Sequence, residues 1–240
     1  MDELPNETRY ATVNALIGQL KNTKTHWWYQ MRLTEALGQV NTLYNAGAAT
    51  RAPVVVQSLV EILIDTQRAW LVRCEAAQAL GRLPYERSVH VGLIAYEIAR
   101  LTQQMSEAYA KDPRQPEWNT CFLKVYLAFQ PVDEDERKKK LGLKLQLEGN
   151  VQLGTHQKLV NASYEQVVAI VRLVVNSAFG VTHADLKGQL ETLDIWLKSN
   201  TPKDNQLDPK LPPLSLPAAA VTRPPNANTT APTPATKTAG

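Results

Sequence analysis

The sequence lacks the local motifs on which most metal sites, nucleotide sites and catalytic elbows depend. It contains no His-x-x-x-His or Cys-x-x-Cys pair, no Gly-x-x-x-x-Gly-Lys loop, no Gly-x-Gly-x-x-Gly turn and no Gly-x-Ser-x-Gly elbow. No histidine lies within metal-ligand spacing of another histidine or of a cysteine; these residues are His26, His90, His156, His183, Cys74 and Cys121. We therefore expect no catalytic residue, no cofactor and no metal, and predict that the protein is not an enzyme.

The sequence also lacks a long apolar run and a secretory signal. Its most apolar segment, 167–175, is interrupted by Arg172 and is far shorter than the roughly 20 apolar residues that a membrane-spanning helix needs. The opening Met-Asp-Glu-Leu-Pro has neither the basic start nor the apolar stretch of a signal peptide. We expect a cytoplasmic protein with no membrane contact, in which both cysteines are buried free thiols.

Charge of one sign is not in excess. The chain has 26 Lys and Arg against 23 Asp and Glu, for a net charge of +3. Nucleic-acid binders usually show a concentrated basic face, so nucleic acid is not the favoured partner. The lysine triplet at 138–140 follows the carboxylates at 134–136 by four positions, which is the favourable order for ion pairs on a helix. The triplet therefore predicts a solvated helix face rather than a phosphate-binding patch.

Residues 131–155 form a charged or irregular connector whose secondary structure the sequence leaves open. Four leucines between 141 and 147 alternate with other residues, which is a strand-like period. Glu-Gly-Asn at 148–150 could then turn the chain back into a small hairpin. An irregular segment or the start of a helix fits the same residues equally well.

Proline separates the last forty residues from the rest. Nine of the 15 prolines lie in 201–240, and no aromatic residue follows Trp196. Such a composition buries too little apolar area to offset the entropy lost on ordering, so we expect 201–240 to be a disordered Pro/Ala/Thr-rich tail. Only Leu-Pro-Pro-Leu-Ser-Leu-Pro at 211–217 is apolar enough to dock on the domain or to serve as a polyproline ligand for another protein.

Helical periodicity dominates the remainder and predicts an all-α fold. Apolar residues recur every three to four positions in segments bounded by proline, glycine or polar turns. The predicted helices span about 7–20, 25–40, 53–65, 69–83, 86–110, 115–130, 158–179 and 183–199.

The strongest pattern is an internal repeat. A shift of 43 residues places Trp27 on Trp70, and places Ala-Leu-Gly at 36–38 on the same tripeptide at 79–81. Paired helices with a period of about 40–47 residues are typical of HEAT and armadillo arrays. A helical wheel puts the polar residues of each copy on one wet face, which carries Arg32, Glu35 and Gln39 in the first copy and Glu75, Gln78 and Arg82 in the second.

Arg73 departs from this pattern, because the wheel places it in the middle of the apolar arc. An unpaired buried charge costs several kcal/mol, so Arg73 needs a partner. Asp65, at the end of the preceding predicted helix, is the nearest candidate in the sequence. We predict that Asp65 and Arg73 form a structural ion pair.

Residues 53–84 resemble the HEAT-repeat family. They give in order a proline-started helix, Asp65, Val-Arg at 72–73 and Ala-Leu-Gly at 79–81. The match is fair over 7–40, where Gln30 replaces the arginine, and faint over 86–130. The resemblance implies a short right-handed solenoid of antiparallel helix pairs over 1–130. We expect 156–200 to be a C-terminal helical pair that caps the stack.

The candidate partner-binding residues are Trp28, Tyr29 and Arg32. Three aromatic residues follow one another at 27–29, and neighbours on a helix point about 100° apart, so they cannot all face one core. Exposed tryptophans are enriched at binding hot spots, although capping the open end of the stack is an alternative role. We predict a non-enzymatic scaffold or adaptor that binds an unidentified protein. A nucleic-acid-binding HEAT-like protein and a regulatory subunit of an enzyme are the alternatives, and the oligomeric state stays open.

Overall fold

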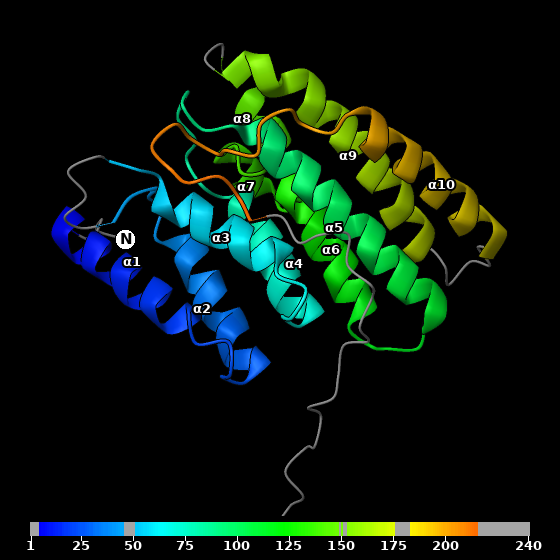
Figure 1. The fold of residues 1–240 in the computed structure, drawn as a ribbon, viewed down its shortest axis with the longest axis horizontal. Coiled ribbons are helices and arrows are strands. Elements are labelled where there is room, and N and C mark those ends of the chain that lie inside the picture. The colour runs from blue at the N-terminus through cyan, green and yellow to red at the C-terminus, as the bar shows by residue number, and fades with distance from the viewer. Residues whose placement is uncertain (1–4, 46–50, 149, 151–152, 176–182, 216–240) are drawn as a thin grey trace, which may run out of the picture.

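The computed structural model describes residues 5–45, 51–148, 150, 153–175 and 183–215. Over these residues the chain is helical and contains no strand, which confirms the predicted all-α fold (Figure 1). The helices are α1 (Asn6–Leu20), α2 (Trp27–Gln39), α3 (Val54–Ile64), α4 (Trp70–Leu80), α5 (Val91–Lys111), α6 (Trp118–Phe129), α7 (Glu134–Lys138), α8 (Leu143–Leu147), α9 (Gly154–Val175) and α10 (His183–Ser199).

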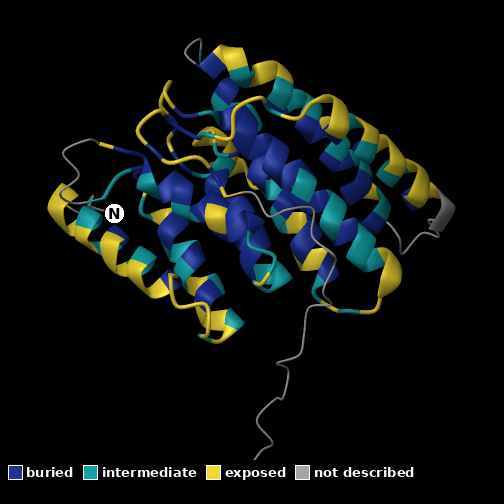
Figure 2. Cartoon of the chain, in the orientation of Figure 1, coloured by how far each residue is buried: buried dark blue, intermediate teal, exposed yellow. Residues whose placement is uncertain are grey.

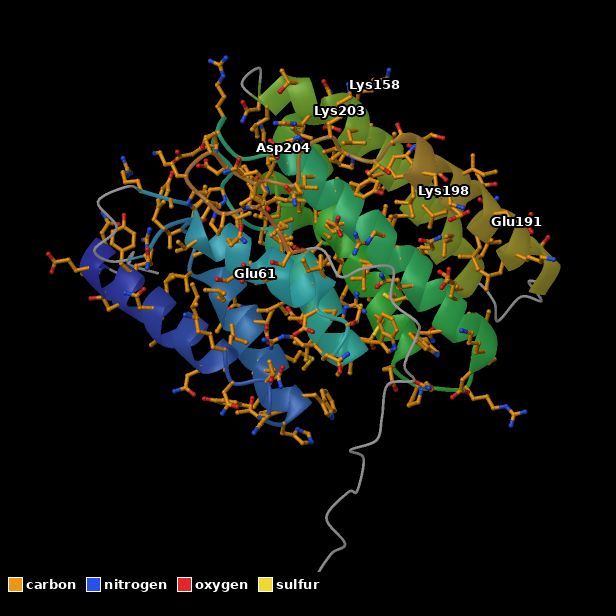
Figure 3. The ribbon with its side chains drawn as sticks, viewed as in Figure 1. Glu61, Lys158, Glu191, Lys198, Lys203 and Asp204 are labelled. Carbon is orange, nitrogen blue, oxygen red and sulfur yellow. The ribbon has the colours of Figure 1, made fainter. Side chains whose placement is uncertain are left out.

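The long helices form two rows of neighbours. In one row α2 packs on α4, α4 on α6 and α6 on α9; in the other α1 packs on α3, α3 on α5 and α5 on α10. The apolar core lies between the rows, so the inner helices are buried and the outer faces of α1 and α10 are exposed (Figure 2). Charged side chains such as Glu61 on α3 and Glu191 and Lys198 on α10 lie outside this core (Figure 3).

The connector at 131–148 contains two short helices, and the hairpin reading is wrong for these residues. Leu143 and Leu147 stand one helical turn apart and are both buried, whereas Leu141 and Leu145 are half-buried. The leucines therefore follow the helical spacing as well as the alternating one. Gly142 begins α8 with φ +94°, a left-handed conformation that glycine adopts without strain.

Two glycines allow the helices of the first row to approach closely. A Cβ on Gly38 of α2 would lie 2.6 Å from the Cβ of Ala79 on α4. A Cβ on Gly81, at the end of α4, would lie 2.4 Å from the carbonyl oxygen of Ala128 on α6. Because both distances are shorter than any ordinary contact, a side chain at either position would push neighbouring helices apart.

The face of α4 predicted to be wet is in fact covered by α6. Glu75 and Gln78 are buried, and the Lys124 ammonium of α6 donates to both, at 2.5 Å to Glu75 Oε2 and 3.0 Å to Gln78 Oε1. Arg82 pairs at 2.8 Å with Glu136 of α7. These side chains are satisfied by one another instead of by water, so their polarity was a misleading signal of exposure.

The first part of the predicted tail is packed on the helices, contrary to our expectation of disorder. Residues 201–215, here called the strap, run back from the end of α10 (Figure 1). Leu207, Leu211 and Leu214 are buried, and the Leu207 carbonyl accepts a hydrogen bond from the His90 backbone N–H at 2.8 Å. Three leucines spaced four and three residues apart thus supply the apolar burial, and two of them, Leu211 and Leu214, belong to the segment named above as apolar enough to dock on the domain. Residues 216–240 lie outside the described residues.

The strap also satisfies much of its own backbone. The side-chain amide of Asn205 donates to the Leu214 backbone carbonyl at 3.0 Å, and the Leu214 backbone N–H donates to the Asn205 backbone carbonyl at 2.9 Å. Gln206 Nε2 donates to the Leu211 carbonyl at 2.6 Å. These bonds close a compact loop in a segment where proline removes several backbone donors.

Candidate protein-interaction site

The first turn of α2 carries two exposed aromatic side chains. Trp28 is 53% exposed and Tyr29 is 42% exposed, whereas the neighbouring Trp27 is half-buried against the core. His26 begins the helix, and its Nδ1 accepts a hydrogen bond from the Trp28 backbone N–H at 3.2 Å. The cap fixes the start of α2 and thereby the directions in which the two aromatic rings leave it.

Arg32 lies one helical turn beyond Trp28 and Tyr29, so the three side chains share one surface of α2. Its side chain is 55% exposed, and its guanidinium pairs with Glu35 at 2.5 Å. We call Trp28, Tyr29 and Arg32 the α2 patch. Two exposed aromatics beside an arginine are the residue types most enriched at binding hot spots.

The second copy of the repeat shows how the same positions behave inside the stack. Under the 43-residue shift, Trp28, Tyr29 and Arg32 correspond to Leu71, Val72 and Glu75 of α4. Val72 and Glu75 are buried, and Leu71 is half-buried. The difference follows from packing, because α4 lies against α2, α3 and α6, whereas α2 lies mainly against α1 and α4.

Arg73 is buried as predicted, but its direct partners are not the predicted one. Its Nε donates to the Leu63 carbonyl at 2.8 Å and one terminal nitrogen donates to Gln104 Oε1 at 2.6 Å. The guanidinium also stands 4.8 Å from the centre of the Trp70 ring. Burial lowers the pKa of Arg73 to about 10, an effect that the nearby Asp65 carboxylate partly offsets. Arg73 therefore remains charged near neutral pH.

Asp65 instead forms its ion pair with Arg68, at 3.2 Å. Arg68 additionally donates to the Leu20 carbonyl at the end of α1 and to Gln30 Oε1 of α2, each at 2.8 Å. The predicted Asp65–Arg73 ion pair is therefore wrong, and Asp65 pairs with Arg68, which follows it by three residues in the turn after α3. The Arg73 guanidinium instead bonds to the Leu63 carbonyl in the last turn of α3 and to Gln104 of α5. Gln30, which takes the place of Arg73 in the first copy of the repeat, is thus a partner of Arg68.

Neither the histidines nor the cysteines form a larger cluster over the described residues. No group of three or more His, Cys, Asp or Glu side chains comes together there in a way that could hold a metal ion. Cys74 and Cys121 are free and buried, and Cys74 Sγ lies 3.2 Å from the sulfur of Met105. A hydrogen bond with Cys74, together with burial, raises the pKa of the Cys121 thiol, which keeps it protonated.

The basic run near α7 lies beside its own acidic residues. Asp133 caps α7, and Lys138 pairs weakly with Asp135 at 3.5 Å, three residues away. The helix ends at Lys138, so the predicted helical pairs of the last two lysines do not form. The exposed lysines therefore adjoin an equal run of carboxylates, which weakens their field at a distance.

No family model matches the chain, and no curated protein or solved structure matches it. Among the described helices, none combines the length and the apolar character that crossing a bilayer requires.

One further buried acid lies in α5. The Glu97 carboxyl is buried beside Arg100, whose guanidinium is 3.3 Å away. Burial raises the pKa of Glu97, and the neighbouring Arg100 and Arg73 charges act in the opposite direction. Its surroundings are the helices themselves, so we assign Glu97 to the packing of α4 and α5.

Proposed function

We propose that the protein is a short HEAT-like helical-repeat scaffold that binds another protein through the α2 patch and catalyses no reaction. The repeat is supported by a contact that occurs twice along the first row. Gly38 of α2 meets Ala79 of α4, and Gly81 at the end of α4 meets Ala128 of α6. Because the same small-residue contact recurs from one helix to the next, α2, α4 and α6 act as successive copies.

The aromatic residues at the helix starts support the third copy. Trp70 and Trp118 begin α4 and α6, and their ring centres are 5.9 Å apart. Aligning these two tryptophans takes a shift of 48 residues, whereas aligning Ala79 with Ala128 takes a shift of 49, and in that second register Gln130 takes the place of Gly81. Gln130 accepts a hydrogen bond from Tyr164 of α9 at 2.9 Å, so α9 closes this end of the array.

The observation that carries the proposal is the difference between the two ends of the row. At the C-terminal end α6 is covered by α9, whereas α2 leaves Trp28 and Tyr29 exposed. Burying two large aromatic side chains at an interface contributes several kcal/mol before the costs of association are subtracted. The arginine beside them favours a protein partner over an apolar small molecule.

The proposal is tested by affinity capture from the native cells, after nuclease treatment, with the full chain as bait. The double variant Trp28→Ala/Tyr29→Ala is compared with Ile195→Ala, which alters an apolar residue of α10 that is 65% exposed. We expect a stoichiometric protein to be retained by the wild type and by the Ile195 variant, and lost from the double variant. Equal retention by all three proteins would place the binding surface elsewhere.

A further inference from the structure

Two histidines far apart in the sequence meet where the strap is held. His90 is the N-cap of α5 and His156 lies in the first turn of α9, and their ring centres are 4.8 Å apart. Gly92 lies beside the pair, where a Cβ would make ordinary van der Waals contacts of 3.4 Å with His156 Nδ1 and with His90 Cε1. The two half-buried imidazoles are thus in contact at the start of α5.

His90 makes two hydrogen bonds that depend on its position. Its Nδ1 accepts from the Leu93 backbone N–H at 2.8 Å, which caps α5. Its backbone N–H donates to the Leu207 carbonyl of the strap, also at 2.8 Å. An imidazolium ion carries protons on both ring nitrogens and has no acceptor. Protonation of the His90 ring therefore removes the side-chain bond that caps α5. The backbone N–H of the same residue is the group that binds the strap.

The surroundings of His156 favour its neutral ring. Burial lowers the pKa of His156, and the charge of His90 lowers it further. A lowered histidine pKa means that the unfolded or released chain binds protons more tightly than the packed one. The packed arrangement is thus most stable above the ordinary histidine value of about 6.5 and loses stability as the pH falls below it.

No carboxylate is among the groups that shift the pKa of His156. The carboxylates of the neighbouring elements that have defined partners are Glu86, bonded to Tyr44, Glu97 of α5, beside Arg100, and Asp194 of α10, bonded to Lys198. In the strap, Asp208 accepts from the Lys210 backbone N–H. Other charged side chains of the adjoining segments include Arg87, Lys144, Lys158, Glu165, Lys203, Asp204 and Lys210, of which Figure 3 labels Lys158, Lys203 and Asp204. The charge that acts on His156 is that of His90.

We propose that His90 and His156 form a proton-sensitive latch, which holds the strap on the helices at neutral pH and releases it when both rings are charged. Two imidazolium rings in contact repel each other, and His90 loses its cap bond at the same time. The strap then loses its backbone bond to His90, while its other end stays attached to α10, where the Thr201 hydroxyl donates to the Leu197 carbonyl at 3.0 Å, and to α5, where it lies 3.3 Å from the Tyr96 hydroxyl. Release uncovers the apolar surface beneath Leu207, Leu211 and Leu214.

Hydrogen–deuterium exchange of the full chain tests this latch. Exchange of peptides from 201–215 and of the His90 amide is measured at about pH 7.5 and about pH 5.5, and each rate is divided by its intrinsic rate at that pH. We expect protection in both regions to fall roughly tenfold on acidification, while peptides of α6, which begins without a side-chain cap, change less than about twofold. Equal protection of the strap at the two pH values would overturn the proposal.

Non-titrating variants locate the effect. His90→Asn keeps a good helix cap without a titratable ring, and His156→Phe keeps an aromatic ring without a charge. We expect either variant to retain most of the strap protection at the lower pH. His26→Asn is the matched control, because His26 caps α2 in the same way but lies away from the strap. If the His26 variant abolished the pH effect, or if neither of the other two reduced it, the latch would be wrong.

Discussion

Helices α2 and α4 are copies of one sequence pattern in different surroundings. Both begin with tryptophan and end with Ala-Leu-Gly, and in both the leucine of that tripeptide is fully buried. Yet α4 is covered by helices on either side, whereas α2 has an uncovered surface that carries Trp28 and Tyr29. The repeat pattern thus specifies which residues meet the next helix, and the position in the row decides which residues meet solvent.

The polar residues of α2 and α4 differ in the same way. Arg32 and Glu35 of α2 pair with each other at the surface, whereas their counterparts Glu75 and Gln78 of α4 are buried beneath Lys124 of α6. An exposed ion pair contributes at most about 1 kcal/mol to the free energy of unfolding. Removing one partner of a buried pair destabilises the fold much more, because the other charge stays buried without a partner. The two copies should therefore respond very differently to equivalent substitutions.

The largest expected loss of stability follows from shortening the buried leucines of α4 and α2 to alanine. Leu80→Ala should lower the free energy of unfolding by about 2–5 kcal/mol, because helices on both sides of α4 prevent the cavity from collapsing. Leu37→Ala should lie at the lower end of this range, since α2 can shift at the open end of the row. Urea denaturation of both variants measures the difference; a loss below about 1 kcal/mol for Leu80→Ala would mean that this face of α4 is not core.

The next largest loss of stability is expected when the charge of Glu75 is removed, with Arg32 as its counterpart on α2. Glu75→Ala should cost about 2 kcal/mol, because it leaves the largely buried Lys124 ammonium without its carboxylate. Arg32→Ala should cost less than about 0.5 kcal/mol. The double variant Glu75→Ala/Lys124→Ala, compared with the two single variants in urea, measures their coupling. Additive effects would show that the ion pair does not join α4 to α6.

The two glycines offer a finer test. Alanine at Gly38 or Gly81 should cost about 1–3 kcal/mol through overpacking. At Gly38 the shortest clash is with the Ala79 Cβ at 2.6 Å and the Ala79 Cα follows at 2.9 Å, so Ala79→Gly should restore part of the loss. At Gly81 the clash is with the backbone of Ala128, so Ala128→Gly should not. Thermal unfolding of the four proteins compares them, and rescue at both sites would contradict the backbone contact.

The smallest expected effect is at the α2 patch. Trp28→Ala should change the free energy of unfolding by less than about 0.5 kcal/mol, because the indole is mostly in solvent. Val72→Ala, at the position that matches Tyr29, should cost more because Val72 is fully buried. Urea denaturation gives both values. A large loss at Trp28 would favour the alternative role of capping the stack over that of binding a partner.

Periodicity predicted the long helices well. Every predicted helix overlaps an observed one, because burial on one face of a helix imposes the spacing that the sequence displays. The helical wheel wrongly predicted that Glu75 and Gln78 are exposed to solvent. The sequence alone does not distinguish a polar side chain in water from one that bonds to a lysine on another helix. Lys124, which donates to both, lies on α6, more than forty residues further along the chain.

The strap was predicted only in part, for a related reason. Its proline content indicated disorder, and only 211–217 was named as able to dock on the domain, because the burial of its leucines depends on a surface made by distant helices. The same holds for Arg73, whose partners Leu63 and Gln104 come from α3 and α5. Of the candidate site, the exposure of Trp28 could be predicted from the repeat, because Trp27 matches the core residue Trp70 and leaves its neighbour outside.

The most direct test of the central claim, that the open end of the row binds a protein, is site-specific photocrosslinking in the native cells. A photoreactive amino acid is placed at position 28, at the equivalent Leu71 of α4, or at the exposed Ile195 of α10. We predict a discrete crosslinked protein from position 28 and none from the other two positions. No crosslink at position 28, or the same products from position 195, would contradict the proposal.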